Sequence, residues 1–151
     1  MRQSRMTRVL AASIATSCGM LPTIAPATPN VATDSAVFVE RVQSETSRQL
    51  EPAERLNRGD RIVTIVTWYR HGGQGAFTIT NPLPGSVSYQ KSARGDEQVS
   101  VDGGKAWGRL ADLKVGSRNA TPEDVTHVRW RISAQNAQSG RGHLAYSGIV
   151  R

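Results

Sequence analysis

The chain has 151 residues, of which 38% are apolar and 21% are charged, and it contains one cysteine. This length suits a single domain with a hydrophobic core, and a lone cysteine excludes both an internal disulfide framework and a multi-cysteine zinc site. Lys and Arg total 19 against 12 Asp and Glu, which gives a formal net charge of +7. That excess permits a weak preference for acidic partners and says nothing about the fold.

The beginning of the chain has the layout of a secretory signal peptide. Arginines at positions 2, 5 and 8 precede a mostly apolar stretch over residues 9–21, and Ala25-Pro26-Ala27 follows. A basic start, a short apolar stretch and an A-x-A-like site are typical of cleaved signals, whereas a membrane-spanning helix needs about 20 apolar residues. We predict a signal peptide over residues 1–27, a periplasmic or extracellular location, and no transmembrane segment after cleavage.

Cleavage after residue 27 would also change the cysteine and charge counts. It removes Cys18 and leaves 16 basic against 12 acidic residues, a net charge of +4. An alternative is that Cys18 is the first mature residue and carries a lipid, because the residues before it faintly resemble a bacterial lipoprotein cleavage site. The two alternatives differ in whether the protein is anchored to a membrane.

The rest of the chain reads as a linker followed by one β domain. Residues 28–35 are small and polar and include proline, which predicts a linker. From residue 36 to 151, runs rich in Val, Ile, Thr, Tyr and Trp recur between turn-forming residues, a pattern typical of an antiparallel β-sandwich. The predicted strands cover residues 37–42, 48–51, 61–69, 76–80, 86–90, 98–102, 125–132 and 143–150.

Three local patterns refine this prediction. Residues 36–56 are read as a hairpin, because strand-prone residues flank a turn-like segment. Residues 61–69 are apolar on both faces, as in a central strand covered on both sides. A short helical turn is predicted over residues 122–124, since Thr121 can cap a helix that starts with proline.

The strand predicted over residues 125–132 shows the clearest alternation. One face is apolar and is predicted to be buried: Val128, Trp130 and Ile132. The other face is basic and is predicted to meet water: His127, Arg129 and Arg131. The basic face is a candidate anion-binding surface, although any solvent-exposed sheet face gives the same alternation.

Residues 100–107 fit the pattern S-x-D-x-G-x-x-W, the Asp box of sialidases and other β-proteins. In such a turn Asp102 can accept backbone N–H bonds, Gly104 can supply a positive φ, and Trp107 can pack beneath. We predict a structural turn made by Ser100 together with these three residues. A glycosidase is not predicted, because a sialidase propeller repeats the box and needs a far longer chain.

Other candidates for chemistry favour structural roles. The carboxylate pairs Asp96-Glu97 and Glu123-Asp124 lie in turn-like settings, and no serine sits in a G-x-S-x-G elbow. Residues 70–75 are glycine-rich and basic, yet they lack the ending of a phosphate loop and are read as a hairpin connection. The basic residues are scattered, which argues against specific nucleic-acid binding. No catalytic residue, metal site or cofactor is predicted.

Several segments together resemble a family of secreted proteobacterial proteins of unknown function, related to the immunoglobulin-like "conserved repeat" domain of bacterial surface proteins. The resemblance covers residues 37–151 and rests on residues 37–42, 50–55, 59–61, 81–84, 100–107 and 124–130. It implies an immunoglobulin-like β-sandwich of about seven or eight strands and an exported location. It implies no activity and no catalytic residues.

We therefore expect an exported, non-enzymatic structural or interaction module of the bacterial cell envelope, whose partner is a protein or glycan of that envelope. Such modules bind through loops or an exposed sheet edge. Two alternatives stay open. One is a carbohydrate- or polyanion-binding module that uses Arg129 and Arg131, and the other, the least favoured, is a small hydrolase on a β-scaffold.

Overall fold

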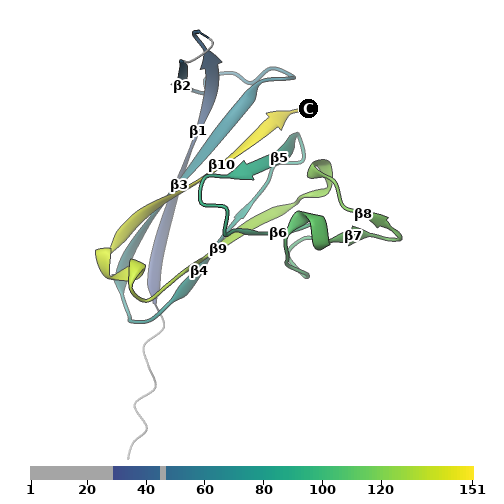
Figure 1. The fold of residues 1–151 in the computed structure, drawn as a ribbon. Coiled ribbons are helices and arrows are strands. Elements are labelled where there is room, and N and C mark those ends of the chain that lie inside the picture. Colours follow the sequence, from purple (N-terminus) through teal and green to yellow (C-terminus); the bar gives the residue numbers. More distant parts are fainter. Residues whose placement is uncertain (1–28, 45–46) are drawn as a thin grey trace, which may run out of the picture.

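The fold is seen in a computed structural model, which describes residues 29–44 and 47–151 (Figure 1). The predicted signal peptide and Cys18 lie outside the described residues. Within these ranges the chain forms strands and three short 3-10 helices, and no helix is long and apolar enough to cross a membrane. The elements are β1 (Asn30–Val42), β2 (Arg48–Pro52), β3 (Arg61–Gly72), β4 (Phe77–Pro82), β5 (Val87–Ser92), β6 (Gln98–Ser100), η1 (Leu110–Asp112), β7 (Lys114–Val115), β8 (Arg118–Asn119), η2 (Pro122–Asp124), β9 (His127–Ile132), η3 (Asn136–Ser139) and β10 (Arg141–Val150).

The strands form two main antiparallel sheets and a small ribbon. The larger sheet has the order β2-β1-β3-β10-β5, the smaller sheet has the order β4-β9-β6, and β7 pairs with β8. In Figure 1 the long strands β1, β3 and β10 run side by side, and the smaller sheet lies to one side of them. The prediction of an all-β fold with antiparallel sheets is confirmed.

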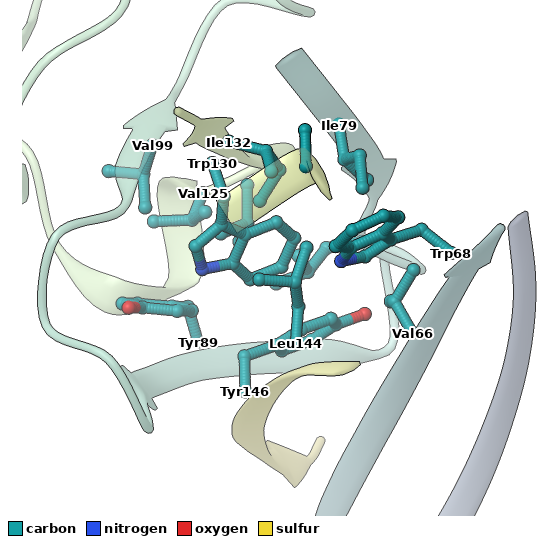
Figure 2. Close-up of a cluster of buried hydrophobic side chains, with 13 residues drawn as sticks. Val66, Trp68, Ile79, Tyr89, Val99, Val125, Trp130, Ile132, Leu144 and Tyr146 are labelled. Atoms are coloured by element: carbon teal, nitrogen blue, oxygen red, sulfur yellow. The ribbon is translucent and has the colours of Figure 1, made fainter. Parts of the chain in front are cut away.

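The core joins the two sheets (Figure 2). It contains buried side chains of β3, β4, β5, β6, β9 and β10: Val66, Trp68, Ile79, Tyr89, Val99, Val128, Trp130, Ile132, Leu144 and Tyr146. Trp130 is 0% exposed, its ring centroid lies 6.1 Å from that of Tyr146, and its Nε1–H donates to Ser92 Oγ at 3.0 Å. A large aromatic ring from the smaller sheet is thus bonded to the larger one, and its polar atom is satisfied inside the core.

One close approach in this core requires a glycine. A Cβ atom at Gly142 of β10 would lie 2.7 Å from the ring of Trp68, its cross-strand neighbour on β3. Trp68 is 3% exposed and its ring packs edge-on against Phe77, with 5.3 Å between centroids. The indole therefore occupies the space that any other side chain at position 142 would need.

The alternation predicted for β9 is confirmed on its apolar side. Val128, Trp130 and Ile132 are each 0% exposed. The hairpin predicted over residues 36–56 corresponds to the antiparallel pair β1 and β2, although residues 45 and 46 of its turn lie outside the described residues. The helical turn predicted over residues 122–124 is η2, where Thr121 N–H donates to Asp124 Oδ2 at 2.8 Å.

The predicted linker over residues 28–35 is corrected by the structure. β1 begins at Asn30, and residues 30–35 pair with β3. Small polar residues have low strand propensity, but pairing with a long neighbouring strand outweighs that local preference. The domain therefore begins earlier than the composition indicated.

Two further predictions about β3 are also corrected. The glycine-rich residues 70–75 do not close a hairpin, because β3 and β4 belong to different sheets and the segment crosses from one to the other. β3 is covered on its core face alone among the described residues. Its opposite face, with half-buried Val63 and Ile65, borders an open groove that Phe38 and Ala145 also line.

Candidate functional site

The Asp-box-like turn follows β6 and is held together by short polar contacts. Ser100 Oγ donates to Asp102 Oδ1 at 2.7 Å and accepts from Gly104 N–H at 2.9 Å. Asp102 Oδ1 also accepts from the N–H groups of Lys105 and Ala106 at 3.0 and 2.9 Å. Gly104 has a φ of 90°, a conformation that disfavours other residues. Backbone donors that would otherwise be unpaired are thereby satisfied inside the turn.

The same bonds set the charge of the turn. The Ala106 N–H and the Ser100 hydroxyl, together with the Lys105 N–H, lower the pKa of Asp102 below its usual value. Hydrogen bonds to a carboxylate favour its ionised form. Asp102 is therefore a fixed negative charge whose hydrogen-bonding capacity is used by its own turn.

Trp107 closes the turn and lies on the outer face of the smaller sheet. Its Nε1–H donates to Gly104 O at 2.8 Å, and the side chain is half-buried. The next residue, Gly108, pairs with Val99 of β6, so that Trp107 lies beside Ser100, which in turn pairs with His127 of β9. The antiparallel register thus aligns turn, β6 and β9 in one row across the sheet.

Thr126 joins the turn to β9. Its hydroxyl donates to the carbonyl of Ser100 and accepts from Gly103 N–H, both at 3.1 Å, and lies 3.0 Å from Nδ1 of His127. His127 in turn packs edge-on against Trp107, with 6.3 Å between ring centroids. Nothing in the sequence pattern singles out Thr126, because the backbone groups of Ser100 and Gly103 that it contacts are more than 20 residues away in the chain.

Arg129 is the residue that brings the two predicted sites together. Its guanidinium carbon lies 4.3 Å from the ring centroid of Trp107, a cation–π contact. Its Nε and Nη2 atoms donate to Oε1 of Gln98 at 2.9 and 2.7 Å. The predicted turn and the predicted basic face of β9 therefore form one cluster, in which Gln98 is a member that the sequence did not indicate.

The cations of this face have no carboxylate partner. The ion pairs among the described residues include neither Arg129 nor Arg131. Arg131 is exposed, and its cross-strand neighbour on β4 is Thr78. Arg129 is held by an uncharged amide and an indole, so neither guanidinium forms an ion pair with a carboxylate of the described residues.

Two further pairs of titratable groups are bound to each other. Arg118 donates to both oxygens of Asp124 at 2.6 Å and, with the N–H of Thr121, holds the pKa of Asp124 well below its usual value. Tyr89 O–H donates to Glu97 Oε1 at 2.6 Å, and burial followed by this carboxylate raises the pKa of Tyr89. Such a tyrosine stays protonated at a pH where a free one would begin to ionise.

Within the described residues no group of three or more His, Cys, Asp or Glu side chains is placed to hold a metal ion. The glycine-rich segment 70–75 is arranged around Arg70, which donates to the carbonyl of Gly75 and lies 5.2 Å from the ring centroid of Phe77. Its arginine is therefore directed at its own loop and a neighbouring aromatic ring.

Comparison with protein-family models, with curated proteins and with solved structures finds no match to the chain. The resemblance to secreted proteobacterial proteins with an immunoglobulin-like domain stays a prediction from the sequence motifs.

Proposed function

We propose that the protein is an exported, non-enzymatic binding module of the cell envelope that recognises an acidic glycan through the outer face of the smaller sheet. The observation that carries this proposal is the position of Arg129, which is stacked on Trp107, bonded to Gln98 and in no ion pair with the part of the chain that the structure describes. A guanidinium that is already ordered loses little conformational freedom when an anion binds.

The surroundings of Arg129 suit an anionic chain. Arg131 lies two residues along β9 on the same face, a separation of roughly 7 Å for an extended strand. The exposed hydroxyl residues Thr78 and Thr80 of β4 pair with Arg131 and Arg129 across the sheet. The face thus presents two cations and two hydroxyl groups, which suit the carboxylates or sulfates and the ring hydroxyls of an acidic sugar chain.

Two further arguments support the other parts of the proposal. The non-enzymatic role is supported by the carboxylates, since Asp102 and Asp124 are each engaged in a turn and keep a low pKa, unsuited to general acid or base work near neutral pH. The exported location rests on the signal-like pattern of residues 1–27.

The proposal is tested by salt elution from a heparin resin. The parent protein is expected to be retained at about 0.15 M salt, and the variant R129A/R131A is expected to elute at clearly lower salt because two fixed charge contacts are lost. The matched control is Arg58→Ala, which removes an exposed arginine that forms no ion pair with the described residues and lies outside the smaller sheet.

A comparison of two single variants makes this test specific. Arg131→Ala alone should lower the eluting salt concentration more than Arg58→Ala, although both change the net charge equally. Equal shifts would mean that the resin senses net charge alone, and the proposed face would be wrong. Thermal unfolding of each variant checks that the fold is retained.

A further inference from the structure

One edge of the larger sheet is open along part of β1. β2 pairs with residues 38–42 of β1, and Ala53 N–H donates to Val37 O at 3.0 Å. Toward the start of the strand, the structure places no element of the described chain beside β1 on this side, while β3 pairs with it on the other. The open edge is residues 30–36.

The bond from Ala53 N–H to Val37 O fixes the direction of the backbone groups along β1. Along a strand, the N–H and C=O groups of successive residues point alternately to the two edges. Because the carbonyl of Val37 points toward β2, the groups of Ser35, Thr33 and Val31 point to the same, open side. The N–H of Ser35 agrees with this direction, since it donates to the side chain of Asp34 at 2.9 Å.

The open edge of β1 lacks the features that protect the edge strands β2, β4 and β5. β2 carries Arg48 and Pro52, β4 ends at Pro82, and β5 carries Lys91. Lysine, other charged residues and proline at sheet edges discourage pairing with another strand. Residues 30–36 contain no Lys, Arg or Pro, and their single charge is Asp34.

We propose that this edge pairs with the same edge of a second copy of the chain, so that the two larger sheets join into one continuous antiparallel sheet. A second copy suits this edge because its residues can pair with themselves in the antiparallel direction without placing like charges opposite each other. The edge is bounded on one side by Pro29, which has no N–H to donate, and on the other by Val37, whose carbonyl is already used. The midpoint between these limits is Thr33.

An antiparallel pair centred on Thr33 satisfies the outward groups of both chains. Thr33 faces Thr33 of the second copy, and Val31 faces Ser35. The outward N–H and C=O groups of these residues then find partners, with the Ser35 N–H exchanging its bond to Asp34 for one to the second copy. Asp34 faces Ala32 of the second copy, and the two carboxylates are kept out of direct opposition. Threonine pairs across strands are favourable, and like charges directly opposite are not. This is a self-complementary contact of the kind found in two-fold symmetric dimers.

The dimer is tested by sedimentation equilibrium of the purified protein over a dilution series. The parent is expected to pass from monomer to dimer as its concentration rises, and Thr33→Pro is expected to stay monomeric because it removes a central donor of the pair. Proline is tolerated at an edge where the N–H faces solvent. The matched control, Thr80→Pro, removes an outward N–H from the free edge of β4 and should dimerise like the parent.

Amide hydrogen exchange of the unmodified protein is a second test of the dimer, and it needs no variant. The amides of Val31, Thr33 and Ser35 should exchange more slowly as the concentration rises. A monomer at every concentration would overturn the proposal, as would a dimer that survives Thr33→Pro, which would place the contact elsewhere. Protection of these amides that does not change with concentration would mean that another part of the same chain covers the edge, and would overturn it equally.

Discussion

The guanidinium of Arg129 lies over the indole ring of Trp107, with 4.3 Å between its central carbon and the ring centroid. Trp107 belongs to the turn after β6, and Arg129 belongs to β9. Through this contact the turn holds the arginine in place. The outer face of the smaller sheet therefore carries a cation at a fixed position.

The two tryptophans Trp130 and Trp107 should differ in their contribution to stability. Trp130→Ala should lower the free energy of unfolding by about 3–5 kcal/mol, since the ring is fully buried and leaves a cavity. Trp107→Ala should cost less, because its ring is half-buried. Urea unfolding of both variants measures the difference. An equal or larger loss for Trp107→Ala would mean that the turn, and not the shared core, governs the stability of the domain.

Gly142→Ala should destabilise the protein by about 1–3 kcal/mol, because the added methyl group would overlap the packed ring of Trp68. Gly85→Ala is the matched control. Its Cβ would meet no atom within 4 Å and its φ is not positive, so we expect a change within about 0.5 kcal/mol. Thermal or urea unfolding compares the two. If Gly142→Ala is also neutral, the contact between β10 and Trp68 is looser than described.

Asp102→Asn should make part of the stability independent of pH. The pKa of Asp102 is lowered in the folded protein, so its ionised form contributes stability above the unfolded pKa of about 4, and this contribution is lost as the pH falls through the folded pKa. The parent should therefore be more stable than the variant at pH 7, and the difference should shrink below about pH 4. Urea unfolding at a series of pH values measures it. A difference that stays constant with pH would show that the charge of Asp102 does not support the turn.

Gln98→Glu should weaken anion binding while leaving the fold intact. The amide oxygen of Gln98 accepts two hydrogen bonds from Arg129, and a carboxylate can accept the same pair while it neutralises the guanidinium. The variant should elute from heparin at much lower salt and unfold no more easily than the parent. A control, Gln90→Glu, adds the same charge on β5 of the larger sheet and should have a smaller effect on elution.

If both glutamate variants lower the eluting salt concentration equally, the effect is one of net charge. The position of Arg129 would then be unimportant for binding, and the proposed face would lose its main support.

The local part of this architecture is readable from the sequence. The alternation of Val128, Trp130 and Ile132 has the period of a strand, and it identifies the buried face of β9 without knowledge of its neighbours. The turn-forming Asp102 and Gly104 are likewise recognised within a few residues. Both features can be recognised because each depends on residues of one strand or one turn.

The parts that the sequence did not reveal depend on distant pairing. Trp107 meets Arg129 because Gly108 pairs with Val99 and β6 pairs with β9, and neither pairing leaves a local pattern. Residues 30–35 resemble a linker by composition and become a strand through pairing with β3. The glycine-rich segment 70–75 connects two sheets, because the partners of β3 and β4 lie elsewhere in the chain.

The binding face itself is tested most directly by titrating a heparin oligosaccharide into isotope-labelled protein and following its nitrogen–proton resonances. The largest shifts are expected at the indole Nε1–H of Trp107, the Nε–H of Arg129 and the backbone amides of β9. These shifts should be lost in R129A/R131A. Shifts centred on Lys91 and Arg48 of the larger sheet, or no saturable shift at all, would contradict it.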